Sequence, residues 1–215
     1  MDAVAHRPTP RPEVNRPTTP SGCDPSAEDS AEAWITSRQN TSPRRLVEPG
    51  PSVSQLQRIF RSAAAAPDHG LVRPWRFVIV PREKRALLAE VFALALVDRD
   101  PGATLEQIET AREKAHRAPV LMLVVAQLGA CEPPIPAVER MVSVGAAVQN
   151  MLLMAHGQGF GSSLTSGQAM QSPRMRQLFG LATGEEAVCF LNIGTVSKRK
   201  ARRLHPEVQN FVSTL

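Results

Sequence analysis

Residues 144–167 read VGAAVQNMLLMAHGQGFGSSLTSG and join a helical pattern to a turn rich in glycine. We expect a long helix over 137–158, in which one set of positions recurs every three or four residues: Val142, Ala146, Gln149, Leu153 and His156. That spacing places them on one face of an α-helix. Gly159 and Gly161 follow at once, and glycine accepts the backbone conformation that ends a helix.

A second informative stretch, AAAAPDHGLVRPWRF, covers residues 63–77. It is preceded by a Ser52 or Ser54 cap and by apolar residues at helical spacing, namely Leu56, Ile59, Phe60 and Ala63. This helix has to end before Pro67, because the residue before a proline avoids the helical conformation. A polar turn follows, and then a strand over 73–81 that is rich in aromatic and β-branched residues.

The rest of the chain alternates between helical and strand-like patterns. We expect helices over 82–98, 104–117 and 172–180, a buried strand over 120–127 (VLMLVVAQ) and a last strand over 187–195. Helices and strands interspersed in this way favour one mixed α/β or α+β domain, and no internal repeat is visible.

Charge and composition separate the N-terminus from the rest. The 215 residues are 42% hydrophobic and 21% charged, as in a soluble globular protein. Residues 1–33 are rich in proline and hold three Arg against six Asp and Glu. We therefore expect a disordered Pro-rich extension there and one domain over 34–215. Since the whole chain carries +5, this domain carries +8 and attracts phosphate-bearing ligands or nucleic acid.

Several classes of protein are disfavoured by what the sequence lacks. No apolar run reaches the roughly 18 residues that cross a bilayer, and the first residues have no apolar stretch typical of a secretory signal peptide. Three scattered cysteines, Cys23, Cys131 and Cys189, suggest free thiols in a reducing compartment. We expect a cytoplasmic protein that does not bind membranes.

Motifs for metal, nucleophilic or nucleotide-loop chemistry are also missing. The five histidines are dispersed, and no G-x-S-x-G, C-x-x-C, Walker or G-x-G-x-x-G pattern occurs in a suitable place. We expect no metal site and no catalytic side chain of the usual kinds. The chemistry then comes from a bound organic cofactor, or there is none.

The two quoted stretches resemble the FMN-dependent nitroreductase family, most closely its compact NAD(P)H nitroreductase branch. Its members carry A-P-S/D-x-x-N/H-x-Q-P-W-x-F and, later, a helix of the form G-A-A-x-Q-N-M-x-L-x-A-x-x-x-G-x-G; the resemblance covers about 35–215. It implies a homodimeric α+β fold with a mostly antiparallel central sheet flanked by helices. It also implies two FMN sites at the dimer interface. FMN would take reducing equivalents from NAD(P)H and pass them to a nitroaromatic, quinone or similar small acceptor.

The resemblance carries over to ten cofactor-binding positions. Two lie in the first basic motif, two in the turn before Pro74, four around and after the glycine turn, and two in the basic tail: Ser42, Arg45, His69, Arg73, Gly159, Gly161, Thr165, Ser166, Lys200 and Arg202. The family has basic residues where this chain has Asn40, Thr41 and Thr165. Arginine bonds phosphate bidentately, so their absence weakens FMN binding unless Arg38, Arg44 or the tail compensates.

Two alternatives to a flavoenzyme remain open. The first is a non-catalytic relative that keeps the fold and dimer but has weakened or lost FMN binding. The second is nucleic-acid binding through KRKARR (198–203), which is disfavoured because no aromatic residues interleave the run. The sequence decides neither the physiological acceptor, nor NADH against NADPH, nor the role of residues 1–33.

Overall fold

The computed structural model describes residues 25–130, 132–201 and 204–215. Its strands are β1 (Leu46–Val47), β2 (Trp75–Ile79), β3 (Val120–Gln127), β4 (Gly161–Thr165) and β5 (Glu185–Val196). Its α-helices are α1 (Pro25–Ser37), α2 (Val53–Ala63), α3 (Arg85–Arg99), α4 (Leu105–Glu113), α5 (Ala137–Gly157) and α6 (Pro173–Phe179). Short 3-10 turns are η1 (Pro43–Arg45), η2 (His69–Leu71), η3 (Arg82–Lys84), η4 (Lys114–His116), η5 (Gln168–Gln171) and η6 (Val208–Asn210).

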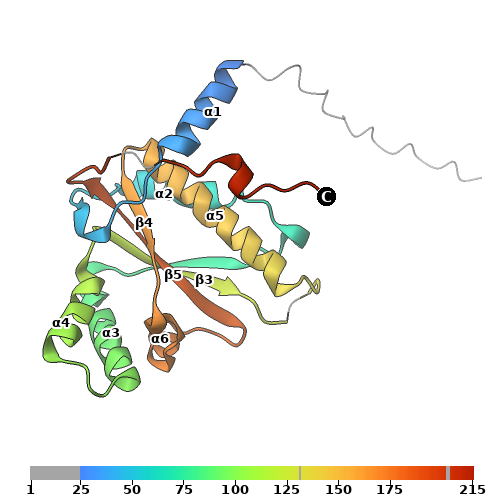
Figure 1. Ribbon diagram of the computed structural model, residues 1–215. Helices are drawn as coiled ribbons and strands as arrows, with labels where there is room; N and C mark the ends of the chain where they lie inside the picture. The colour runs from blue at the N-terminus through green and yellow to red at the C-terminus, as the bar shows by residue number, and fades with distance from the viewer. Residues whose placement is uncertain (1–24, 131, 202–203) are drawn as a thin grey trace, which may run out of the picture.

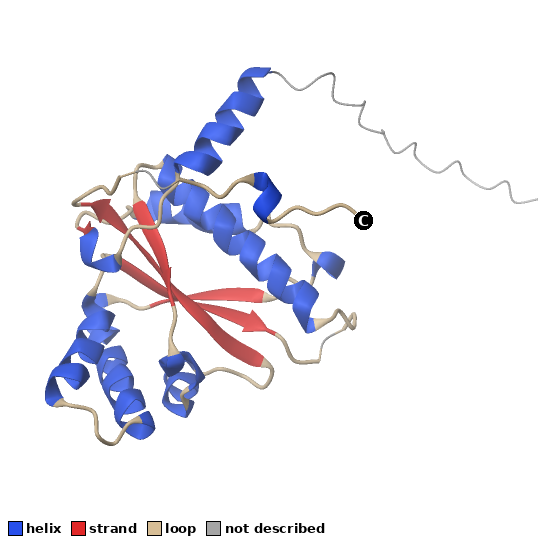
Figure 2. Ribbon diagram, in the orientation of Figure 1, coloured by secondary structure: helices blue, strands red, loops and turns tan. Residues whose placement is uncertain are grey.

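The strands form one sheet at the centre of the molecule (Figures 1 and 2). Its order is β1-β5-β3-β2, and β4 also pairs with β5. Every pairing between these five strands is antiparallel. The predicted α+β fold, a mostly antiparallel sheet flanked by helices, is therefore confirmed.

Strand β3 is a continuous apolar run because both faces of the sheet are covered. Alternate residues of a strand point to opposite faces. Met122, Val124 and Ala126 belong to one core cluster, and Leu121, Leu123 and Val125 belong to the other. A strand buried on both sides needs apolar side chains at every position.

Helices α2 and α5 cover one face of the sheet, and α3, α4 and α6 lie on the other side (Figure 1). Helix α5 contributes Val144, Ala147, Met151 and Ala155 to the first core, each no more than 1% exposed. On the second face, Phe190 of β5 makes edge contacts with Phe92 and Phe179.

Local signals set the helix boundaries. A capping box begins α2, in which the Ser52 hydroxyl accepts from the Gln55 N–H and the Gln55 side chain accepts from the Ser52 N–H. Another capping box, at Thr104, begins α4. Helix α6 ends at Gly180, whose φ of 56° is left-handed. The expected helices and strands are confirmed with small shifts at their ends.

Two strands were not predicted from the sequence. Residues 161–165, which begin at the end of the expected glycine turn and for which we predicted no strand, form β4 along β5, and Leu46–Val47 form β1. The sequence GSSLT of β4 has low strand propensity, so tertiary pairing decides its conformation.

The expected N-terminal extension is only partly described. Residues 25–33 belong to helix α1, which projects from the rest of the domain in Figure 1, so this part differs from the expected disorder. Residues 1–24 of that prediction lie outside the described residues. Cys23 and Cys131 also lie outside the described residues. Cys189 is buried, and burial raises the pKa of its thiol to about 11. No described helix is both long and apolar enough to cross a membrane.

Candidate functional site

The glycine turn after α5 brings the segment 40–42 against β4. Gly159 has a φ of +85°, which an L side chain rarely adopts. Asn40 forms a parallel bridge with Ser162, and the Thr41 N–H donates to the Ser162 carbonyl at 3.0 Å. A Cβ at position 161 would overlap Val196 and Leu46, so Gly161 permits this close approach.

A cleft of about 370 Å³ opens beside this contact, and we call it the basic cleft. Segments around residues 37–45, 156–162 and 196–200 form its walls. Its lining side chains include five cations, Arg38, Arg45, Lys198, Arg199 and Lys200. None of the described residues that line it is acidic. Together with the hydroxyl of Ser42, this set of donors suits a phosphate group.

Burial and neighbouring positive charge both act on His156 in the basic cleft. It lies in the last turn of α5 and lines the cleft. Partial burial lowers the pKa of its imidazole first, and the charges of Arg38 and Arg199 lower it further. The protonated imidazole is therefore disfavoured at this point of the cleft.

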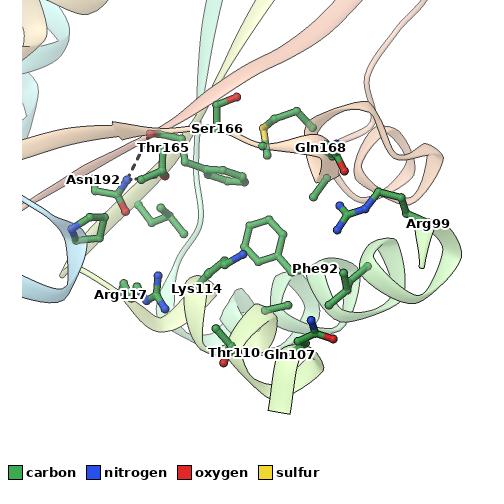
Figure 3. Close-up of a pocket in the computed structure, with 18 of the residues that line it drawn as sticks. Phe92, Arg99, Gln107, Thr110, Lys114, Arg117, Thr165, Ser166, Gln168 and Asn192 are labelled. Carbon is green, nitrogen blue, oxygen red and sulfur yellow. Dashed lines mark hydrogen bonds between the residues drawn. The ribbon is translucent and has the colours of Figure 1, made fainter. Parts of the chain in front are cut away.

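A larger hollow of about 550 Å³ lies on the α3–α4 side of the sheet, and we call it the apolar cavity (Figure 3). Its floor includes Phe92, Leu121 and Phe190. Its polar lining comes from β5, from residues 99–117 and from residues 165–168; it includes the acidic Asp100 and Glu106, and Figure 3 labels Arg99, Gln107, Thr110, Lys114, Arg117, Thr165, Ser166, Gln168 and Asn192. A hollow of this volume, with apolar side chains beside polar groups, is of the size that small molecules occupy.

The lining of the apolar cavity contains a hydrogen bond and a partly buried arginine, and one of its edges adjoins the basic cleft. The Asn192 side-chain amide donates to the Thr165 hydroxyl at 3.0 Å, as the dashed line in Figure 3 shows. Burial lowers the pKa of Arg117, and the nearby charge of Arg44 lowers it further. Pro43 lines the apolar cavity and its neighbour Ser42 lines the basic cleft, so the two hollows adjoin the same turn.

The turn before Pro74 lies at the other end of α5. His69 is 64% exposed, and its Nδ1 lies 2.6 Å from Oε2 of Glu139, in the first turn of α5. The Arg73 N–H donates to Asp68, and Arg73 has an unusual positive φ of 47°. At 1.5 Å per residue, Glu139 lies about 25 Å along the helix from His156.

The structure thus divides the ten predicted positions into groups. Five meet at the basic cleft: Ser42, Arg45, Gly159, Gly161 and Lys200. Thr165 and Ser166 line the apolar cavity instead. His69 and Arg73 lie far from both within one chain, and Arg202 lies outside the described residues.

Sequence reasoning missed the polar residues of the apolar cavity, above all Lys114, Arg117 and Asn192. They come from a helical turn and a strand that are distant in the sequence, so no motif joins them. One signal was available: Asn192 is an amide within the apolar run VCFLNIGT, and burying a polar side chain there costs free energy unless it finds a hydrogen-bond partner.

Comparison with known proteins decides the family. The model of the family described as "Nitroreductase family" matches residues 38–195. The chain belongs to the nitroreductase family. The matched segment, 38–195, includes two of the three wall segments of the basic cleft and the strands that line the apolar cavity, whereas Lys198, Arg199 and Lys200 of the cleft lie beyond it.

Curated members of the nitroreductase family match over most of their length. A protein of Escherichia coli K12 named "Putative NAD(P)H nitroreductase YdjA" is 34% identical over 188 residues, which cover 86% of this chain and 98% of that protein. A Haemophilus influenzae protein named "Putative NAD(P)H nitroreductase" is 32% identical over 182 residues, covering 84% and 97%.

Solved structures share the fold at lower identity. A nitroreductase-like family protein from Bacillus cereus superposes with a TM-score of 0.73 at 17% identity, covering 92% of this chain and 99% of that one. A mutant of the FMN and NADPH-dependent nitroreductase NfnB from Sphigopyxis sp. strain HMH gives a TM-score of 0.68 at 17% identity, covering 86% and 98%. These likenesses confirm the nitroreductase fold.

Within the described part of the chain, no three His, Cys, Asp or Glu side chains gather as a metal would need.

Proposed function

We propose that the protein is an FMN-dependent oxidoreductase that passes reducing equivalents from NAD(P)H to a nitroaromatic, quinone or similar acceptor. One observation carries the proposal: a cleft lined by five cations and no described acidic residue adjoins the same turn as an apolar cavity with a polar rim. The family and the names of its curated members support it.

The residues present fit the two ends of FMN. The basic cleft supplies guanidinium, ammonium and hydroxyl donors for a phosphate, including those of Arg45, Lys200 and Ser42. The apolar cavity supplies a hydrophobic floor for a ring system, with Thr165 and Asn192 as hydrogen-bonding groups. A ligand with a charged end and a flat aromatic end matches this pair of hollows.

The cations of the basic cleft also compensate for the basic residues that the family has where this chain has Asn40 and Thr41. Arg38 precedes them, and Lys198 and Arg199 reach the same cleft from the end of β5. A positive field depends on the number and proximity of the charges rather than on their place in the sequence. We therefore propose that the protein binds FMN although it lacks the family's pair of basic residues at positions 40 and 41.

A dimer explains why His69 and Arg73 lie so far from the cleft. The outer face of α5 exposes apolar residues, with Val138 72% and Val142 68% exposed, and a Cβ at Gly145 would meet nothing within 4 Å. We propose that this face packs on the same face of a second copy. A two-fold axis near the middle of α5 sets the two helices antiparallel and exchanges their ends.

That arrangement completes each site from two chains. The cleft lies at the C-terminal end of α5 and His69 lies at its N-terminal end. In an antiparallel pair, the second copy's His69 and Arg73 approach the first copy's site. All the predicted positions described by the structure then serve one cofactor.

The protein's own part in the reaction is to bind and to orient. FMN, when bound, supplies the redox chemistry by taking a hydride from NAD(P)H and passing on its electrons. The apolar floor excludes water, and the Asn192–Thr165 hydrogen bond fixes the direction of the polar groups that face the cavity. The cavity is lined by three cations, Arg99, Lys114 and Arg117, against two carboxylates, Asp100 and Glu106, so its lining has a small excess of positive charge.

The test is a visible spectrum of the purified protein before and after FMN is added, followed by NAD(P)H oxidation with a nitroaromatic or a quinone. We expect absorption bands of bound flavin and turnover that requires FMN. A protein that binds no FMN refutes the proposal. Binding without NAD(P)H oxidation would support the non-catalytic relative.

A further inference from the structure

Helix α1 docks on the C-terminal end of α5 through a tryptophan. The indole of Trp34 lies against Gly157, where an added Cβ would overlap ring atoms of the indole. It also meets the imidazole of His156 edge to face, with ring centroids 6.4 Å apart and an interplanar angle of 86°. Only a residue without a side chain at 157 allows this approach.

The same helix contributes to the wall of the basic cleft. The hydroxyl of Ser37, the last residue of α1, forms a 2.9 Å hydrogen bond with Nε2 of His156. Ser37 and His156 both line the cleft, and so does Arg38, the residue that follows α1. Arg38 is close enough to His156 for its charge to act on the imidazole.

A second contact holds the end of α1. The imidazole Nε2 of His205 lies 3.3 Å from the carbonyl oxygen of Thr36. The C-terminal segment therefore lies beside the same turn of α1. Arg38 thus lies between two anchored segments: the end of α1, held at Trp34 and Thr36, and residues 40–41, held on β4.

We propose that α1 is a phosphate-positioning element: docked through Trp34 on Gly157, it holds Arg38 and the Ser37–His156 pair at the phosphate end of the basic cleft. This inference rests on the proposed function. It assigns to α1 the phosphate contacts that Asn40 and Thr41 do not provide. The family model begins at residue 38, so it gives α1 no role.

The substitution Gly157→Ala tests this with little risk to the fold. Alanine is favoured over glycine inside a helix, so α5 gains rather than loses helical stability. The added methyl would overlap the indole, and we expect its displacement to undock α1. Trp34→Ala removes the same contact from the other side. Ile35→Ala is the matched control, because Ile35 is a 56% exposed apolar residue on the same helix.

The measurement is the Kd of the FMN-free protein for FMN and for riboflavin, which lacks the phosphate, by quenching of flavin fluorescence. We expect Gly157→Ala and Trp34→Ala each to weaken FMN binding about tenfold, which corresponds to about 1.4 kcal/mol. Riboflavin binding should not change in either variant. Ile35→Ala should bind both ligands as the wild type does.

The double variant sharpens the test. If both substitutions act only by undocking α1, Trp34→Ala with Gly157→Ala should weaken FMN binding no more than either alone. Arg38→Gln should weaken FMN binding and leave riboflavin binding unchanged.

Two results would overturn the inference: unchanged FMN affinity in both docking variants, or an equal loss for FMN and riboflavin, which indicates a general disturbance. A wild-type protein that binds no FMN would instead refute the proposed function, and this inference with it.

Discussion

Replacing Val142 by Glu tests whether a second copy covers α5. Val142 lies on the outer face of α5 and is 68% exposed in the single chain. If the helices of two copies pack there, the new carboxylate is buried without a partner in each copy. The expected result is a monomer that has lost most of its affinity for FMN.

The magnitude follows from burial and charge. Full burial of a valine side chain contributes about 1.5–3 kcal/mol, so its exposed two-thirds represent about 1–2 kcal/mol. Desolvating an unpaired carboxylate costs several kcal/mol more. With at least about 3 kcal/mol in each copy, two-fold symmetry gives about 6 kcal/mol per dimer, or a rise of about 20,000-fold in the dimer Kd.

Sedimentation velocity across a concentration series measures the dimer Kd, and fluorescence quenching measures the affinity for FMN. Leu105→Glu is the matched control, because Leu105 is an 81% exposed aliphatic residue at the start of α4, across the sheet from α5. The control should remain a dimer. A Val142→Glu protein that stays dimeric, or a monomer with wild-type FMN affinity, refutes the reasoning.

Three further outcomes are expected. The guanidinium of Arg76, bonded to Glu185 at 2.6 and 2.7 Å, lowers the pKa of that carboxyl, so this stabilisation is present near neutral pH and lost as pH falls through the lowered pKa. In urea titrations at pH 7, Glu185→Gln should lower the free energy of unfolding by about 1–3 kcal/mol. The difference between variant and wild type should narrow below about pH 4.3, and a difference that persists at pH 2 would contradict the argument. Thr165→Val removes the nearest of the three acceptors of the Asn192 amide and should raise the Kd for FMN and riboflavin alike by about fivefold, for about 1 kcal/mol; an effect on FMN alone would place Thr165 at the phosphate. Ser52→Ala removes the cap of α2 and should lower the unfolding free energy by about 1 kcal/mol in thermal melts, with FMN affinity unchanged.

The prediction of the fold succeeded where local signals and burial agree. Strand β3 has the predicted bounds because every one of its positions is apolar up to the final Gln127, and α5 begins and ends within a residue of the predicted 137–158. Strand β4 escaped prediction because small polar residues form it only by pairing with β5.

The predicted site residues show the same division. Ser42, Arg45 and Lys200 were carried over from motifs, and the fold gathers them in one cleft. Thr165 was expected where the family has a basic residue, yet it lines the apolar cavity and bonds Asn192. Ser42 lines the basic cleft and Pro43 lines the apolar cavity, so the two hollows adjoin the same turn, which only the three-dimensional structure shows.

The sequence by itself determined the family, the order of the main helices and strands, and a surplus of positive charge, since motifs, periodicity and composition are local properties of the chain. The tertiary structure decided where that charge acts and which residues share a hollow. Trp34 and Gly157 are 123 positions apart in the chain, and Lys114 and Asn192 are 78 apart. Packing brings each pair to one place, because burial of apolar surface acts between residues regardless of their distance in sequence.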